Sequence, residues 1–259
     1  MKLITSLTIC VLLFTSCSKE EENYDFTVSR GVATFYTLIA DALPNIFEVE
    51  DYIATGSPLP FCGEIELLAG DSALYPIQDD TIIYKLTYDS AGCVDYDSRI
   101  KSGSVRFFFY PDPANRDFLI SFDNLRIGDF TLSGSIIVIK ENYNQYDYLI
   151  KSFSFEMDHV KDELTISTDV KGRVDYEGLG TSLKLKLEDL NGKDLEGKTF
   201  KVGATADLVK SATCDYLSSG ILEIKPNGLN WRTLDFGGGV CDPYARVTGG
   251  STTLAFSVP

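Results

Sequence analysis

The chain has 259 residues, of which 44% are hydrophobic and 24% charged, so it is long enough for one large globular domain or two smaller ones. This composition excludes intrinsic disorder and collagen-like repeats. There are 38 acidic residues against 23 basic ones, and the formal net charge of −15 repels the phosphate backbone of nucleic acids. The single histidine, His159, excludes zinc sites and catalytic pairs that need two imidazoles.

The N-terminus carries a targeting segment rather than a part of the fold. Residues 3–14 are apolar, which is typical of a signal-peptide core and too short to cross a bilayer as a helix. Small residues then lead into Cys17, in a pattern that resembles the lipobox of bacterial lipoproteins. The resemblance implies that residues 1–16 are removed and that Cys17 is acylated. The alternative is an ordinary secretory peptide with an incidental cysteine.

A polar segment, predicted over residues 17–27, forms a solvated tether between the lipid and the domain. The lysine and three glutamates at positions 19–22 also resemble the export signal that follows the acylated cysteine in Bacteroidota lipoproteins. This resemblance implies a protein that is anchored by lipid in the outer membrane and exposed at the cell surface.

The remaining cysteines predict two disulfides. Cleavage removes Cys10 and acylation uses Cys17. The four that remain are Cys62, Cys93, Cys214 and Cys241. Four cysteines permit three connectivities outside the reducing cytosol, and their separations of 31 and 27 residues favour pairing the first two and the last two. No CxxC spacing supports a metal site, and structural disulfides are favoured over reactive thiols.

An internal repeat supports this pairing. Residues 83–93 align without gaps with residues 231–241, so that apolar positions and a cysteine coincide. Past one gap, 99–103 aligns with 246–250, with an arginine and a glycine in the same places. Each unit has the pattern of strand, tight turn, cysteine, short loop and strand. The chain is therefore predicted to contain two related β modules.

The segment 28–58 is predicted to be helical, because apolar residues from Val32 to Leu43 recur at a spacing of three and four. Pro44 is expected to end or kink this helix, so that a second short helix begins at Ile46.

From residue 59 the pattern changes to short strands separated by turns. The predicted strands cover 82–88, 104–110, 117–127, 130–139, 147–157, 181–187, 219–224, 229–236 and 252–258. Residues 107–110 are aromatic on both faces of their strand, which predicts a central strand with a helix or second sheet on one side. The fold class is therefore mainly β. An N-terminal helix precedes two antiparallel β modules, over 59–160 and 161–259, in a sandwich or a long twisted sheet.

Two blocks of sequence resemble a known family. Residues 93–103 and 122–138 contain a cysteine, an acidic turn, an arginine, a glycine and an FDN strand, and residues 234–248 contain DFG, Cys-Asp and Ala-x-Val-Thr. These blocks are similar to uncharacterised Bacteroidota cell-surface lipoproteins, over most of the mature chain. The resemblance implies a location and a β architecture without implying a reaction.

Candidates for catalysis are few. Glycoside hydrolysis needs two facing carboxylates, and Glu64 with Glu66, or Asp95 with Asp97, would share a strand face. With 38 acids in the chain, chance supplies many such pairs, and a solvated face is the favoured interpretation. His159 lacks a GxSxG elbow or a catalytic-cysteine context. No catalytic residue is therefore assigned.

Residues 189–197 partly resemble a calcium-binding loop, because oxygen-bearing side chains alternate around a glycine. The glycine comes too early for an EF-hand, and Asn191-Gly192 and Glu196-Gly197 are better explained as turns. No metal or cofactor is predicted.

Ligand binding has one aromatic candidate segment. Tyr143, Tyr146 and Tyr148 stand among amide and carboxylate residues, the combination that sugar recognition uses. Trp231 aligns with Ile83 in the repeat and is expected in the core. We therefore expect a binding or structural protein that contacts a glycan or a host macromolecule, with a surface hydrolase using a carboxylate pair as the alternative.

Overall fold

The structure is a computed structural model and is mainly β, with one N-terminal helix and antiparallel strands, as the sequence predicts. It describes residues 26–59, 62–75, 79–94, 99–111, 117–142, 145–159, 163–164, 172–176, 181–187, 190–193 and 197–259. No helix within this described part is long and apolar enough to cross a membrane.

The elements follow one another in a simple order. The helix α1 spans Thr27–Thr55, and a short 3-10 helix, η1, spans Ser72–Leu74. The strands of the first module are β1 (Glu64–Ala69), β2 (Ile82–Val94), β3 (Ile100–Phe109), β4 (Asp117–Ile127), β5 (Phe130–Asn142) and β6 (Gln145–His159). Those of the second are β7 (Glu163–Leu164), β8 (Gly172–Asp175), β9 (Leu183–Leu187), β10 (Leu190–Lys193), β11 (Thr199–Lys210), β12 (Ser219–Pro226), β13 (Arg232–Gly238), β14 (Tyr244–Gly249) and β15 (Thr252–Ser257).

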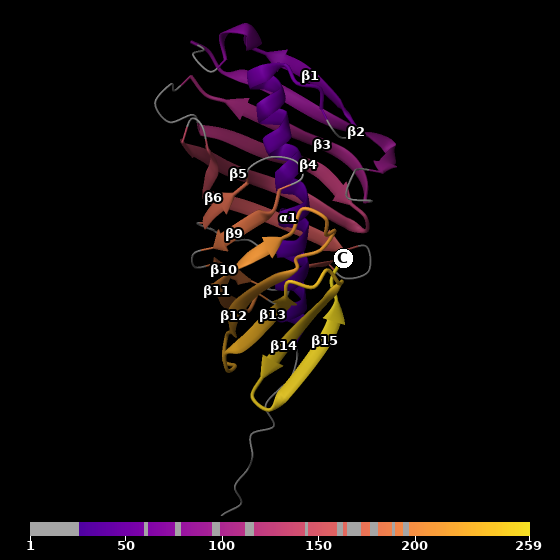
Figure 1. The fold of residues 1–259 in the computed structure, drawn as a ribbon, viewed down its shortest axis with the longest axis vertical. Helices are drawn as coiled ribbons and strands as arrows, with labels where there is room; N and C mark the ends of the chain where they lie inside the picture. Colours follow the sequence, from indigo (N-terminus) through magenta and orange to yellow (C-terminus); the bar gives the residue numbers. More distant parts are fainter. Residues whose placement is uncertain are drawn as a thin grey trace, which may run out of the picture.

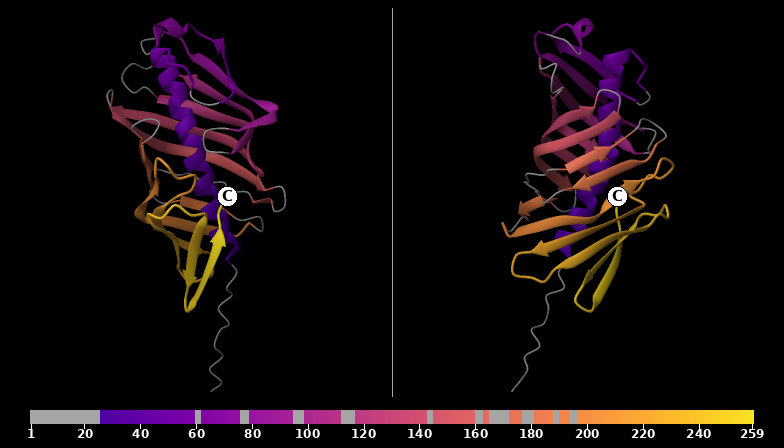
Figure 2. Two further views of the ribbon diagram at one scale, coloured as in Figure 1. Left: turned by 45° about the vertical axis from the view of Figure 1, so that its right-hand side comes forward. Right: turned by 60° about the vertical axis from the view of Figure 1, so that its left-hand side comes forward.

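Hydrogen bonding joins the two modules into one continuous order of strands. The order is β1-β2-β3-β4-β5-β6-β8-β9-β11-β12-β13-β14-β15, with β7 on β6 and β10 on β11. The passage between modules is made by β8, which pairs with β6 on one side and β9 on the other. The sheet twists strongly and curves about α1, which runs along the long axis of the molecule while the strands cross it (Figures 1 and 2).

The helix is enclosed rather than laid on a surface. Every residue from Phe35 to Phe47 is buried, so all faces of these turns are covered. Pro44 lies inside this continuous helix, and the expectation that it ends the helix there is wrong. Because proline removes one backbone hydrogen bond, the helix is held through this position by packing on all sides. Burial also raises the pKa of the Tyr36 phenol, which therefore stays protonated.

The start of the helix also differs from the predicted tether. Phe26 is buried and the Arg232 guanidinium lies 5.0 Å from its ring centroid. The helix then begins at Thr27, so the described fold includes the last two residues assigned to the tether.

Contacts along α1 run in reverse order to the chain. Phe26, which directly precedes the helix, meets Arg232 of β13, near the end of the second module. Toward its C-terminus, the Glu50 carboxylate accepts a hydrogen bond of 2.9 Å from the Tyr75 hydroxyl, close to η1 of the first module. One helix therefore contacts both ends of the sheet. The C-terminal strands of the chain pack against the N-terminal end of the helix.

The two disulfides join the pairs that the spacing favours, Cys62 with Cys93 and Cys214 with Cys241. Their places in the two modules correspond. Each links the segment that precedes one strand (β1 or β12) to the end of the next (β2 or β13). The aligned apolar residues also correspond, since Leu86 of β2 and Leu234 of β13 are both in the core.

The aromatic strand β3 is an interior strand, paired with β2 and β4, and its inner face belongs to the core. In β3, Phe107 and Phe109 are buried on the inner face while Phe108 between them faces outward and is half-buried. The ring of Phe109 stacks on that of Phe118 from β4, with centroids 5.2 Å apart.

Several strands are not predicted by the alternation of apolar and polar residues. The 12-residue β11 is the main one, and its pairing with β12 contains register shifts near Ala204 and Ala206. Each shift breaks the alternation by which strands are found in a sequence. The predicted turn at Asn191-Gly192 is also wrong, because both residues lie in β10 and pair with β11. The flat ring of Phe200 fills the space beside Gly192, where a Cβ would lie 2.2 Å from it.

Candidate functional site

The predicted carboxylate pairs do not form a catalytic arrangement in the described part of the chain. Glu64 and Glu66 share a face of β1, as expected, but both are exposed, and Glu66 stands opposite Lys85. Asp95 and Asp97 lie outside the described residues. His159 ends β6, where its backbone is opposite Phe130.

The buried carboxylates have partners of their own. Among described acids, Asp41 and Glu50 are buried, and both belong to α1. Nine residues of helix place them about 13 Å apart along the axis, more than the separation across which glycosidases use a carboxylate pair. Glu50 accepts the hydrogen bond from Tyr75, and Asp41 is neutralised by two cations.

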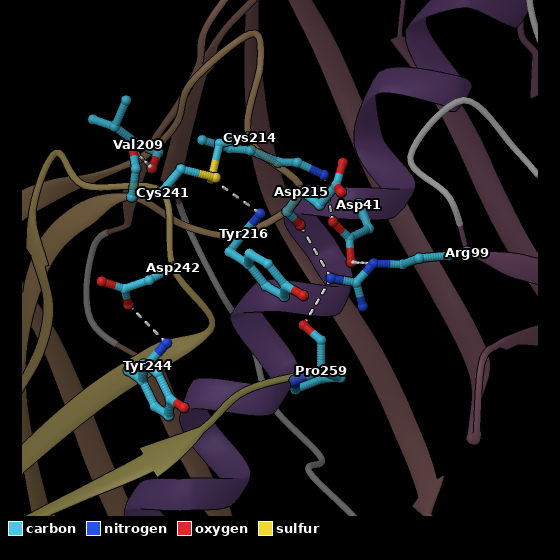
Figure 3. Close-up of a disulfide and its surroundings, with 12 residues drawn as sticks. Asp41, Arg99, Val209, Cys214, Asp215, Tyr216, Cys241, Asp242, Tyr244 and Pro259 are labelled. Carbon is cyan, nitrogen blue, oxygen red and sulfur yellow. Dashed lines mark hydrogen bonds and ion pairs between the residues drawn. A yellow bond between two sulfur atoms is a disulfide. The ribbon is translucent and has the colours of Figure 1, made fainter.

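Asp41, at the midpoint of α1, is the centre of a buried ionic cluster, and Figure 3 shows its side chain beside that of Arg99. Its side chain is fully buried, and its Oδ2 lies 3.0 Å from Nε of Arg99. Its Oδ1 accepts a hydrogen bond from Nζ of Lys210, at the end of β11. We call these three residues the ionic junction. They join the helix to one residue from each β module.

Arg99 extends the ionic junction to the last residues of the sequence. Its Nη2 donates to the main-chain oxygens of Asp215, at 3.1 Å, and of Pro259, at 2.7 Å. The guanidinium also lies 5.9 Å from the ring centroid of Tyr216. Cys214 directly precedes Asp215 in the sequence. Its disulfide to Cys241 therefore fixes the loop that accepts the hydrogen bond from Arg99 (Figure 3).

The ionic junction is closed to ligands by its burial. Asp41 is inaccessible, and the side chains of Arg99 and Lys210 are only 13% and 11% exposed. Charges withdrawn from water in this way are costly unless they are paired and hydrogen-bonded. The arrangement therefore positions segments of the chain.

The predicted tyrosine segment is only partly within the described chain. Tyr143 lies outside it. Tyr146 and Tyr148 lie in β6, with the backbone of Tyr148 opposite Lys140 on one side and Val174 on the other. A ligand-binding role for these tyrosines stays a prediction. The described residues contain no group of three or more metal-binding side chains.

Trp231 is exposed, which corrects the expectation that it belongs to the core. The residue is 50% exposed to solvent. Its repeat partner, Ile83, also faces outward and is half-buried, since the neighbours Ile82 and Tyr84 occupy the inner face of β2. The sequence already held this signal. Leu234 is three residues from Trp231, so the alternation of a strand puts the two on opposite faces.

Trp231 belongs to a row of outward side chains across neighbouring strands. Asn191 of β10 is directly opposite Lys201 of β11, and Lys201 is opposite Lys225 of β12. The Lys225 ammonium then lies 5.4 Å from the centroid of the Trp231 ring. All four side chains are exposed. We call them the basic–aromatic row.

Hydroxyl groups continue the same face. Thr233, two residues after Trp231, is opposite Thr248 of β14, and the Thr248 hydroxyl is 3.0 Å from that of Thr253. An exposed indole, ammonium groups, an amide and hydroxyls therefore share one outer surface of the second module. Such a set offers an apolar ring together with hydrogen-bond donors and acceptors.

The chain matches no protein-family model, no curated protein and no solved structure.

The ionic junction yields a prediction about stability. Replacing Asp41 by asparagine leaves two largely buried cations without their anion, and we expect the free energy of unfolding to fall by about 3–5 kcal/mol. The matched control is Asp175→Asn, which breaks the exposed pair with Arg173 and should cost about 1 kcal/mol or less. Urea unfolding of the oxidised protein measures both. Equal effects of the two substitutions would contradict the account of the junction.

Proposed function

We propose that this protein is a lipid-anchored binding protein of the outer-membrane surface, and that the outer face of its second module contacts glycans. The observation that carries the proposal is the exposure of Trp231 within the basic–aromatic row. Because the indole is a rigid ring with few rotatable bonds, it packs against the apolar face of a sugar ring at little cost in conformational entropy. The neighbouring amide and hydroxyl groups supply hydrogen bonds to sugar hydroxyls.

The direction of α1 determines how a lipid anchor at the N-terminus would orient the fold. The helix begins beside β13 and β15, since Phe26 contacts Arg232 and the Arg30 guanidinium lies 5.7 Å from the Phe256 ring centroid. Its 29 residues extend about 43 Å from there to the first module. A lipid on Cys17 would thus hold the second module nearer the membrane and project the first module outward, with both modules accessible from the medium.

The described carboxylates of β1 and α1 do not favour the alternative function, a surface hydrolase. Those on β1 are exposed, and those on α1 are separated and already paired. Binding requires only the surface that the second module presents.

The anchor is tested by removing its attachment point. In cells fed a palmitate analogue, the wild-type protein should be labelled, and Cys17→Ala should lose the label because no other residue follows the lipobox pattern. Protease added to intact cells should digest the wild-type protein. Labelling that persists in Cys17→Ala, or resistance of the wild-type protein in intact cells, would contradict the anchor or the surface location respectively.

Glycan binding is tested by truncating the indole. On an array of polysaccharides, Trp231→Ala should bind its ligands at least tenfold more weakly than the wild type, because the stacking face is lost. Tyr244→Ala is the control, since Tyr244 is an aromatic residue of similar exposure, 57%. It begins β14, at the end of the strand away from Thr248. A wild-type protein that binds no polysaccharide would refute the proposed function, and so would equal binding by wild type and Trp231→Ala.

A further inference from the structure

The basic–aromatic row has a charge pattern that specifies its ligand further. We propose that it binds an acidic glycan, in which carboxylate or sulfate groups meet the ammonium groups of Lys201 and Lys225 while a sugar ring packs on Trp231. This inference rests on the proposed glycan binding and names the class of glycan.

The first argument is the direct pairing of two lysines. Lys201 and Lys225 are opposite each other on neighbouring strands, and both side chains are exposed. Like charges directly opposite in a sheet destabilise it. Within the described part of the chain, neither ammonium group forms an ion pair with a carboxylate. On β12, Glu223 faces the same side, but its cross-strand neighbours are Gly203 and Thr233 rather than a lysine.

The second argument compares the row with the whole molecule. The chain carries a net charge of −15, so most of its surface repels a polyanion. Lys201 and Lys225 stand on adjacent strands without an ion pair among the described residues, and an acidic chain can approach at such a place. An anionic ligand removes the repulsion between the two lysines as it binds.

The third argument is the position of Lys225 over the indole. Its ammonium group is 5.4 Å from the centroid of the Trp231 ring. An anionic group bound to this nitrogen therefore stands beside the ring face, and an apolar sugar face joined to that group can reach the indole. Uronic acids and sulfated sugars have this combination of an anionic substituent and an apolar ring face. The amide of Asn191, at the other end of the row, is available to neighbouring hydroxyls.

The test uses polymers that differ only in charge. Polygalacturonate is compared with its methyl ester, and dextran sulfate with dextran, by binding to the immobilised protein at 50 and 200 mM salt. We expect the wild type to bind an acidic polymer at least tenfold more tightly than its neutral form, with affinity falling as salt rises. The double variant Lys201→Gln/Lys225→Gln should lose this preference.

The control variant is Lys184→Gln/Lys186→Gln, which removes the same charge from exposed lysines of β9 and should keep the preference. Equal binding of acidic and neutral forms, both weakened by Trp231→Ala, would overturn the acidic specificity and leave glycan binding intact. Failure to bind any of the four polymers would overturn the inference, and binding to the wider array would then decide the proposed function separately. Preferential binding to phosphatidylglycerol vesicles over both acidic polymers would show a lipid surface as the partner and also overturn it.

Discussion

Polar side chains in the enclosed turns of α1, from Phe35 to Phe47, impose the main constraint on this structure, because they lose their hydrogen bonds to water and require partners within the protein. Thr37, Asp41 and Asn45 recur at a spacing of four and share one face of α1. The Thr37 hydroxyl is satisfied locally, by donating to the carbonyl oxygen of Ala33. Asp41 and Asn45 require groups from the sheet, and an unpaired buried charge there would cost several kcal/mol.

Meeting that requirement ties both modules to the helix. Asn45 donates to the Tyr88 hydroxyl of the first module, while Asp41 binds Lys210 of the second and Arg99 of the first. Through Arg99, the same cluster holds the main chain at Pro259. The inner face of the sheet is therefore committed to the helix. Recognition is left to outward residues, which the strand alternation places in rows such as that of Lys201, Lys225 and Trp231.

The sequence predicts the fold class because its strongest signals are local: helical spacing, alternating strands, and cysteines at matching places in a repeat. The sequence does not predict β11, because register shifts interrupt the alternation of its residues. It also overestimates the effect of Pro44 on helix continuity, since a helix packed on all sides tolerates the lost hydrogen bond. Spacing along the chain gives no sign that Arg99 meets Asp41, because that contact forms only when the sheet curves around α1. The sequence also does not predict which residues join Trp231 in the basic–aromatic row, because cross-strand register decides this. The outward direction of the indole could be predicted, since Trp231 is three residues from the core residue Leu234.

Hydrogen exchange of backbone amides in α1 is the most direct test of the enclosed helix. If both modules hold it, amides between Phe35 and Phe47 should exchange as slowly as the most protected amides of β3 and β12, because they open only with the whole fold. Faster exchange of these helical amides, with the two strands still protected, would show that the helix opens independently and contradict this account.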